Sequence, residues 1–423
     1  MKGWRHAGTE ILVLGIAFAA ALDGVSAEDA LPASTGEVGT IAAADPPPTP
    51  FPDRVILTWR GDPATTQAVT WRTDASVREA FAQLARAVAS PNLEEDARLF
   101  TAQTTPLEVG TDTVCYHAVD FDGLLPETLY AYRVGSTAGW SEWFQFRTAS
   151  REGPFSFLFL GDAQTDIHSL WSRVVRAAYA AAPQARFIIH AGDLVSHGDD
   201  DAQWEGWFRA GGWIPAVVSN IPAVGNHEYL RKAGGPRELS PFWRAQFTLP
   251  ENGVPGLEEL NYFIEYQEAL IVVLDSYREE AAQAAWLDSI LGTRSPRWTI
   301  ACFHEPIYSA AKDRDNAEMR ALWQPVLEKH GVDLVLQGHD HVYARGKRPA
   351  EEGTAGGGGP VYVVSVSGPK MYAAAEGRWM ERVGENTQLY QIVTVGSDTL
   401  RYEARTVTGE RFDAFELIRP RGE

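Results

Sequence analysis

The sequence is poor in positive charge. Its 37 lysines and arginines stand against 56 aspartates and glutamates, for a formal net charge of −19. A field of this sign repels nucleic acids and anionic membrane surfaces, so we expect no nucleic-acid binding. An anionic substrate would need a local source of positive charge, and bound metal ions are one such source.

Cysteine is nearly absent. Only Cys115 and Cys302 occur, and neither stands in a Cys-x-x-Cys or zinc-finger spacing. They fall in parts of the chain with different strand patterns, so we expect two buried thiols and no disulfide framework. The spacing also excludes metal chemistry that uses thiolate ligands.

No apolar run reaches the roughly 20 residues that a membrane-spanning helix needs. The run at residues 11–22 is shorter, follows Lys2 and Arg5, and precedes the small-residue sequence Val25-Ser26-Ala27. This order is typical of a signal peptide over residues 1–27, cleaved near Ala27. We therefore expect a secreted or periplasmic protein with no membrane span in the mature chain. Residues 28–52, rich in alanine and proline, predict a linker.

Residues 53–150 alternate apolar and polar side chains in short runs separated by turn residues. The clearest runs are residues 55–59, 68–72, 113–117 and 129–134. This spacing predicts an all-β sandwich, and residues 123–135 resemble the corner and following strand of fibronectin type III domains. Residues 77–103 interrupt the pattern and predict an inserted alanine-rich helix or loop.

From residue 154 to residue 418 the pattern changes to strands that alternate with helices, which predicts an α/β domain. The predicted strands are residues 155–160, 187–191, 223–225, 270–274, 299–303 and 334–336, and the predicted helices are residues 167–182, 279–291 and 316–330. Residues 360–418 return to strands, including residues 361–365 and 390–395.

Several of these strands run directly into a polar residue that can bind a metal ion. Because the carboxyl ends of strands share one edge of an α/β sheet, such side chains can converge from distant parts of the sequence. The converging set is Asp162, Asp193, Asn226, His304, His339 and His341, with His227 beside it.

The motifs in this set differ in specificity. A glycine and an aspartate after a strand, as at Asp162 and Asp193, also occur in turns and helix caps. Gly225-Asn226-His227-Glu228 is more specific, because asparagine is an uncommon ligand and the adjacent histidine could serve the substrate. Gly338-His339-Asp340-His341 is more specific again, since two imidazoles two residues apart can point to neighbouring metal ions.

The ordered series resembles the calcineurin-like metallophosphoesterase superfamily. Together with the preceding fibronectin-like domain it is most similar to the purple acid phosphatase branch, over about residues 53–418. The resemblance implies an α/β fold in which a four-layer β-sandwich is flanked by helices, preceded by an all-β fibronectin III-like sandwich. Residues 53–150 and 154–418 would be the two domains.

The resemblance also implies a role for each ligand. Asp193 would bridge two metal ions, which would be Fe, Zn or Mn. The first ion would also take Asp162 and His341, and the second Asn226, His304 and His339. His227 would bind no metal and would contact the phosphate or protonate the leaving oxygen.

Charge counting favours hydrolysis at such a site. Two divalent ions and two aspartates leave a charge of about +2, enough to hold a phosphate dianion. The metals lower the pKa of bound water, and the resulting metal-bound hydroxide can attack phosphorus directly, with Asp193 and His227 as the catalytic residues. No covalent intermediate is needed.

The sequence departs from the family pattern near the site. Purple members place a tyrosinate three residues after the bridging aspartate, where this chain has Ser196, so the purple colour should be absent. Gln164 replaces a histidine of many relatives and would be either a neutral ligand or a neighbour of the ligands. His197, Lys312 and Arg314 could bind the phosphate or lie in solvated loops.

The leading hypothesis is a phosphatase that acts on a small phosphate ester and splits phosphate monoesters, in the manner of acid phosphatases. The alternative is a phosphodiesterase or nucleotide hydrolase with the same metal centre, because the neighbouring loops decide which substrate fits. A protein of another kind, in which the sandwich binds a surface and the α/β domain is inert, would leave costly buried polar groups without a purpose.

Overall fold

The computed structural model describes residues 47–230, 237–348 and 359–419. The predicted signal peptide and residues 28–46 of the predicted linker lie outside these ranges. Among the described residues, no helix combines the length and apolar character that crossing a membrane requires. Cys115 and Cys302 are both buried and free.

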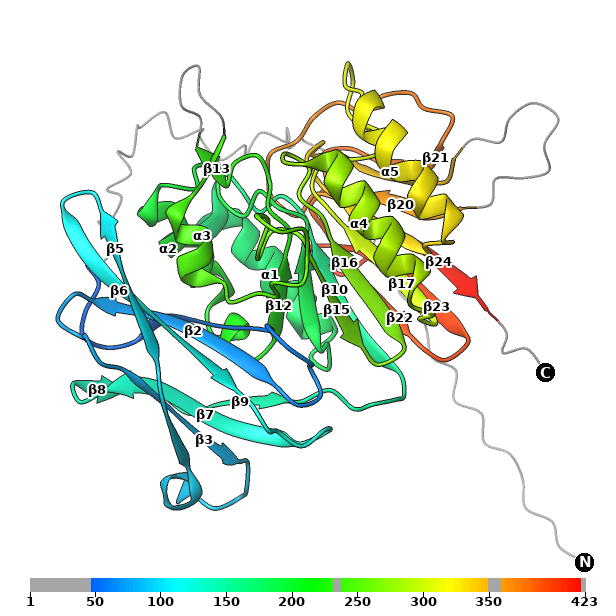
Figure 1. Cartoon of the computed structure of the whole chain (residues 1–423). Helices are drawn as coiled ribbons and strands as arrows, with labels where there is room; N and C mark the ends of the chain where they lie inside the picture. Colours follow the sequence, from blue (N-terminus) through cyan, green and yellow to red (C-terminus); the bar gives the residue numbers. More distant parts are fainter. Residues whose placement is uncertain (1–46, 231–236, 349–358, 420–423) are drawn as a thin grey trace, which may run out of the picture. The chain divides into compact units, whose positions relative to one another are not determined.

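The first part of the described chain is a β-sandwich of two antiparallel sheets (Figure 1). The first sheet has the order β1 (Asp53–Thr58), β2 (Gln67–Asp74), β6 (Asp112–Phe121), β5 (Gln103–Val109). The second has the order β4 (Arg98–Thr101), β3 (Phe81–Arg86), β7 (Leu129–Ser136), β8 (Gly139–Trp140), and β9 (Phe144–Arg147) also pairs with β7. The alternating runs predicted β1, β2, β6 and β7, because one face of each sheet supplies buried residues such as Trp71, Phe121 and Tyr132 to a shared core.

The prediction of a helix or loop over residues 77–103 is wrong. The segment contains strands β3 and β4, and only a single 3₁₀ turn at Leu93–Asp96. Alanine, glutamine and arginine in β3 favour a helix by propensity, but β3 is paired on both sides, with β4 and β7. Its buried Ala82 and Leu84 follow the period of two that a sheet face requires.

The second part consists of two packed sheets. The six-stranded sheet has the order β12 (Ser219–Pro222), β11 (Phe187–His190), β10 (Phe155–Leu160), β22 (Leu389–Val395), β23 (Thr399–Thr406), β24 (Arg411–Ile418). The seven-stranded sheet has the order β15 (Tyr262–Tyr266), β16 (Ala269–Val273), β17 (Trp298–Cys302), β18 (Leu334–Gln337), β20 (Val361–Val364), β19 (Tyr343–Gly346), β21 (Met380–Gly384). β10, β11 and β12 are parallel, and so are β16, β17, β18 and β20.

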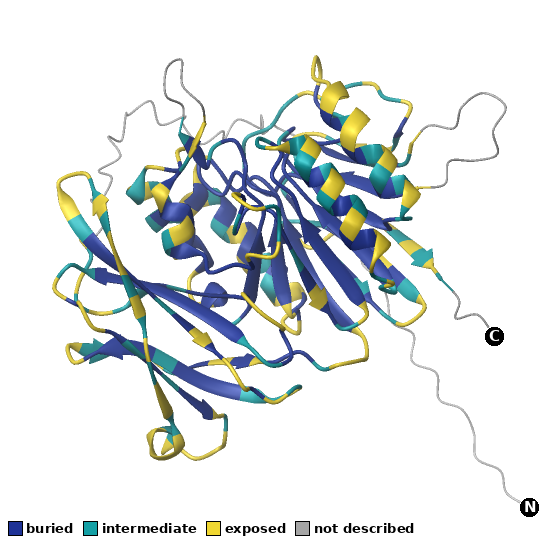
Figure 2. Cartoon of the chain, in the orientation of Figure 1, coloured by how far each residue is buried: buried dark blue, intermediate teal, exposed yellow. Residues whose placement is uncertain are grey.

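Helices cover the outer faces of both sheets (Figure 1). These helices are α1 (Ser172–Ala181), α2 (Asp201–Gly211), α4 (Glu280–Gly292) and α5 (Ala317–Lys329). The short α3 (Pro241–Gln246) contacts β5 and β6 of the sandwich. Along β16, Leu270 and Val272 pack with α4 and α5, whereas Ile271 and Val273 face the other sheet. The central strands of both sheets are therefore buried on both faces, as the dark ribbons of Figure 2 show, and the four layers confirm the predicted fold class.

Two predicted elements of the α/β domain differ from the structure by more than one residue at an end. The strand predicted at residues 223–225 ends earlier, since β12 is Ser219–Pro222 and the following residues form the loop that leads to Asn226. The helix predicted at residues 167–182 begins with a π-helical turn at Ile167–Trp171 before α1. Short strands β13 (Tyr229–Leu230) and β14 (Glu238–Leu239) and a 3₁₀ turn at Ile214–Ala216 complete the described elements.

Buried arginines join the sandwich to helix α2. The Arg54 guanidinium lies 2.7 Å from Asp201 and 3.3 Å from Glu205, and that of Arg72 lies 3.0 Å and 3.3 Å from the same two carboxylates. Arg72 also lies 2.7 Å from Asp53. Both arginines are at most 6% exposed, so their charges depend on these partners.

Candidate metal centre

Five strands of the α/β domain end at the same place. Asp162 follows β10, Asp193 follows β11 and Asn226 follows β12, all in the six-stranded sheet. His304 follows β17, and the segment with His339 and His341 follows β18, in the seven-stranded sheet. The centre is therefore built where the carboxyl ends of the parallel strands meet, as the sequence pattern predicted.

The backbone turns sharply at four of these positions. Asp162, Asp193, His339 and His341 have φ between 49° and 70°, which non-glycine residues rarely adopt. Such conformations persist only where the surrounding structure enforces them. Next to Asp193, Gly192 has φ 87°, and a side chain there would come within 2.7 Å of Gly225 N and His304 Nδ1. The glycine of this motif is thus required by a close approach of two loops.

Two groups of side chains have ligand atoms that all lie within 4.8 Å of one another. One group is Asp162, Asp193 and His341, and the other is Asp193, His304 and His339. Asp193 belongs to both groups. The first group has the members that the resemblance implied for the first ion, and the second has those implied for the second ion except Asn226. The division of these ligands between two ions stays a prediction.

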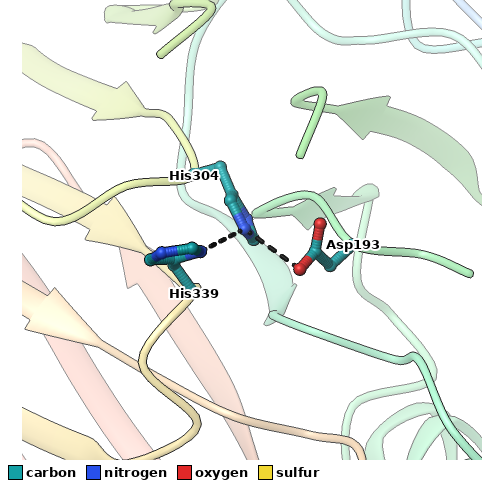
Figure 3. A group of neighbouring side chains, drawn as sticks. All are labelled: Asp193, His304 and His339. Carbon is teal, nitrogen blue, oxygen red and sulfur yellow. Dashed lines mark hydrogen bonds and ion pairs between the residues drawn. The ribbon is translucent and has the colours of Figure 1, made fainter. Parts of the chain in front are cut away.

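His304 lies between Asp193 and His339 (Figure 3). Its Nδ1 donates to the carbonyl oxygen of Ala191 at 2.6 Å, which leaves Nε2 at 3.2 Å from Asp193 Oδ2 and 3.1 Å from His339 Nδ1. Burial alone would lower the pKa of His304, but the neighbouring Asp193 and Asp162 carboxylates raise it to about 10. Burial, together with the charge of His304, lowers the pKa of His339 to about 2.

The two aspartates differ in their surroundings. Asp162 accepts hydrogen bonds from the backbone amide of His339 at 2.9 and 3.0 Å, yet burial raises its pKa well above the ordinary value. Burial would also raise the pKa of Asp193, but the charge and hydrogen bond of His304 outweigh it and the pKa lies below the ordinary value. Asp193 is therefore the carboxylate that stays ionised at the shared position.

Gln164 lies between the first group's side chains. Its Nε2 is 2.8 Å from Asp193 Oδ2 and 3.0 Å from His341 Nε2, while its buried Oε1 has no hydrogen-bond partner among the described residues. Exchanging the nitrogen and oxygen of this amide would turn Oε1 toward the same two neighbours, where it could serve as a neutral ligand. The position is compatible with both predicted roles, a neutral ligand or a neighbour of the ligands.

His227 is placed beside Asp193 by its own backbone. Its amide donates to Asp193 Oδ1 at 3.0 Å, and its Nδ1 lies 2.6 Å from the carbonyl oxygen of Ser196. Nδ1 must carry a proton to donate to that carbonyl, so Nε2, 3.9 Å from Asp193 Oδ2, is the nitrogen left for other partners. Burial lowers the pKa of His227 and keeps the ring neutral.

Glu228 has a role that the sequence did not reveal. Its carboxylate accepts from the backbone amides of Asp193 at 3.0 Å, Leu194 at 2.9 Å, Val195 at 3.4 Å and Gly225 at 2.8 Å. Burial raises the pKa of Glu228 to about 7. The signal that could have found it is its position in Gly225-Asn226-His227-Glu228, where a fully buried acid in a loop needs donors.

The centre opens into a pocket of about 440 Å³. The pocket is lined by Asp193, Asn226, His227, His339 and His341 and by Arg237, Glu305, Arg314, Lys370 and Tyr372. Arg314 was predicted as a substrate contact, whereas Arg237, Lys370 and Tyr372 were not. His197 and Lys312 are exposed and are not among the lining residues.

The residues of the centre fit a pair of metal ions. Asp162 and Asp193 are each 1% exposed, and within the described ranges the groups that form ion pairs with them are histidines. Two buried carboxylates are costly without a compensating cation. Carboxylate oxygens, imidazole nitrogens and an amide oxygen suit zinc, manganese and iron.

Comparisons with known proteins identify the families that two segments of the chain match. Residues 52–148 match the family described as purple acid phosphatase, N-terminal domain, and residues 155–343 match the calcineurin-like phosphoesterases. The Fe(3+)-Zn(2+) purple acid phosphatase 12 of Arabidopsis thaliana is 30% identical over 254 residues, covering 55% of this chain and 52% of that protein. The match therefore spans about half the length of the plant enzyme.

A second relative is matched over a longer stretch. Acid phosphatase type 7 of Homo sapiens is 27% identical over 341 residues, covering 74% of each chain. Among solved structures, a purple acid phosphatase from yellow lupin seeds has a TM-score of 0.74 at 17% identity, covering 87% of this chain and 74% of that chain. At this identity the likeness shows a shared fold.

Proposed function

This chain belongs to the calcineurin-like phosphoesterases, in the purple acid phosphatase branch, and we propose that it uses two metal ions to hydrolyse phosphate monoesters. The observation that carries the proposal is the position of Asp193, which is shared by both groups of potential ligands. A carboxylate in this position can hold two ions next to each other.

The ligands would divide between the ions as follows. One ion would be held by Asp162, Asp193 and His341, with Gln164 beside them, and the other by Asp193, Asn226, His304 and His339. Fe, Zn or Mn suits these ligands, and one relative is named for iron and zinc. Such ions supply positive charge for the phosphate and activate water for attack on phosphorus.

His227 has the geometry of a substrate contact. Because Nδ1 is held by Ser196, its Nε2 is the atom that can meet a phosphate oxygen in the pocket. A phosphate dianion next to Nε2 raises the pKa of the imidazole and favours a proton on that atom. The protonated ring can then donate to the phosphate or to the leaving oxygen.

The test is hydrolysis of 4-nitrophenyl phosphate and of bis(4-nitrophenyl) phosphate by purified protein loaded with Fe, Zn or Mn. We expect faster cleavage of the monoester, and loss of both activity and bound metal in Asp193→Asn. Asp288→Asn is the matched control, because Asp288 pairs with Lys329 and His330 at the surface between α4 and α5.

The outcomes separate the candidate functions. Faster cleavage of the diester would favour the phosphodiesterase alternative. No cleavage of either substrate with any of the metals would remove the enzymatic proposal, and full activity in Asp193→Asn would remove the proposed ligand set.

We also propose that the enzyme acts after export. The support is the order of basic, apolar and small residues in residues 1–27. Mass spectrometry of the protein purified from the culture medium or periplasm should show a chain that begins at Glu28, and an intact Met1 there would contradict the proposal.

A further inference from the structure

The pocket above the metal centre carries more positive charge than one phosphate needs. Arg237, Arg314 and Lys370 all line it, in a chain whose formal net charge is −19. In the proposed function, His227 and two bound metal ions would already supply partners for the phosphate that is cleaved. Apart from the proposed metal ligands, one carboxylate, Glu305, also lines the pocket, and Arg314 pairs with Asp340, so the three cations still outnumber these two acids. An excess of positive charge in one pocket of an acidic protein points to a second anionic group on the ligand.

Arg314 is held in place by the site itself. Its Nη1 donates to the carbonyl oxygen of His339 and to Asp340 Oδ1, each at 3.1 Å. Its guanidinium also lies over the ring of Tyr372, 4.9 Å from the centroid. A guanidinium has five N–H donors, so the fixed Arg314 keeps donors for a ligand.

Lys370 lies on the same aromatic ring. Its Nζ is 5.5 Å from the centroid of Tyr372, whose ring is 4.9 Å from that of His341. Tyr372 thus packs against the proposed metal ligand His341. Arg314 and Lys370 both lie over its ring, and both line the pocket together with His341. An ammonium group with three donors suits the binding of an anionic oxygen.

Arg237 lies over a different ring next to the second group of ligands. Its guanidinium is 4.4 Å from the centroid of Tyr277, and the Tyr277 hydroxyl is 3.5 Å from Asn226 Oδ1. The Tyr277 ring is also 6.1 Å from that of His304. At two places in the pocket, therefore, cations lie over aromatic rings that contact residues of the metal centre.

We propose that Arg237, Arg314 and Lys370 form a second anion subsite, which selects phosphate monoesters whose leaving group carries another anionic group. The shared chemistry is a cluster of anionic oxygens, from either a carboxylate or a second phosphate. This inference rests on the proposed phosphatase function, because the scissile phosphate must occupy the metal centre for its leaving group to reach these cations.

The test compares substrates that differ only in the second charge. In the first pair, 3-phosphoglycerate has a carboxylate where glycerol 3-phosphate has a hydroxymethyl group. In the second pair, fructose 1,6-bisphosphate has a phosphate where fructose 6-phosphate has a hydroxyl. We expect kcat/KM to be at least about tenfold higher for the more anionic member of a pair, the effect of one charge-assisted hydrogen bond. Which pair shows the larger ratio identifies the preferred anion.

The variants Lys370→Met and Arg237→Met should bring that ratio close to one while leaving kcat/KM for glycerol 3-phosphate within about threefold of the original protein. Arg314 is not replaced, because the buried Asp340 would lose its charged partner. Arg401→Met is the matched control, since Arg401 pairs with Glu416 at the surface of β23. Metal content and melting temperature are measured for every variant.

Each outcome has a separate meaning. If the variants lose kcat/KM equally for both members of a pair, the cations bind the scissile phosphate. If the original protein has nearly the same kcat/KM for both members, no second subsite exists. Both results overturn the inference and leave the phosphatase function intact. Only failure to hydrolyse any phosphate monoester would remove the proposed function itself.

Discussion

The Nδ1 atom of His227 lies 2.6 Å from the carbonyl oxygen of Ser196, and this contact sets the direction of the ring. The backbone of Ser196 is in turn fixed by a hydrogen bond to a side chain of helix α2. Gln203 Oε1 accepts from the backbone amides of Ser196 at 2.8 Å and of His197 at 3.0 Å. One carboxamide on a helix therefore fixes the peptide that orients the proposed substrate contact.

This relationship predicts that Gln203→Leu will lower kcat. Without the carboxamide the Ser196 carbonyl can move, His227 loses its orientation, and a shift of about 1 Å is enough for a loss of about ten- to a hundredfold. Metal content should stay unchanged, because Gln203 contacts none of the proposed ligands. Gln324→Leu removes a comparable carboxamide that contacts Glu328 on α5. Similar kinetics for both variants would show that Gln203 has no positioning role.

A second prediction concerns Glu228, whose two oxygens each accept from two backbone amides. In Glu228→Gln one oxygen becomes an amino group that faces two N–H donors, and each buried donor without a partner costs about 1–3 kcal/mol. We expect the free energy of unfolding to fall by at least about 2 kcal/mol. Since two of the donors flank Asp193, metal affinity should fall at least about tenfold.

Chemical denaturation and metal titration test this prediction. Glu259→Gln is the control, because Glu259 is also a buried acid that accepts a backbone amide, that of Leu249 at 3.1 Å, but lies outside the metal centre. If both variants lose stability and neither loses metal affinity, Glu228 supports the fold and not the site.

His190 predicts how stability changes with pH. It is buried, its Nε2 lies 3.0 Å from Asn220 Oδ1, and burial lowers its pKa to about 4 from an ordinary value of about 6.5. Below about pH 6.5 this residue is protonated in the unfolded chain, whereas in the folded chain it is protonated only below about pH 4. Stability therefore falls as the pH falls through this window, by up to about 3 kcal/mol from this residue.

Denaturation of the metal-free protein by urea at about pH 7 and about pH 4.5 measures this effect. His190→Gln cannot titrate, so its stability should fall less between the two conditions than that of the original protein. An equal fall in both proteins would contradict the assignment of the effect to His190.

The colour of the iron-loaded protein gives another prediction. With Ser196 in place of the tyrosine of purple relatives, we expect no visible absorption band from charge transfer between a tyrosinate and iron. Ser196→Tyr should introduce the band, and a purple original protein would show that another tyrosine reaches the iron.

The strand pattern predicted the fold and the neighbourhood of the proposed ligands. Asp162, Asp193 and His304 each follow a strand that is apolar on both faces, and a strand of that kind has few alternative registers. Because parallel strands end at one edge of a sheet, the order of motifs along the chain was enough to predict that these side chains meet.

Other features depend on contacts that no local pattern encodes. The segment with β3 has a helical composition, and its strand pairing is decided by β4 and β7. Arg237 and Lys370 lie in loops without periodicity, and only their contacts with Tyr277 and Tyr372 show that they belong to the pocket. The same holds for Gln203, whose partners become neighbours only after the chain turns into α2.

The buried arginines of the sandwich have a consequence for how the protein can be divided. Ile56 and Trp59 share one hydrophobic core with Phe187 and Tyr266 of the α/β domain, and Arg54 and Arg72 neutralise the acids of α2. An enzyme expressed without its first hundred residues would expose that apolar surface and leave those acids without partners. The sandwich and the α/β domain thus depend on each other for stability, and the smallest fragment expected to fold contains both.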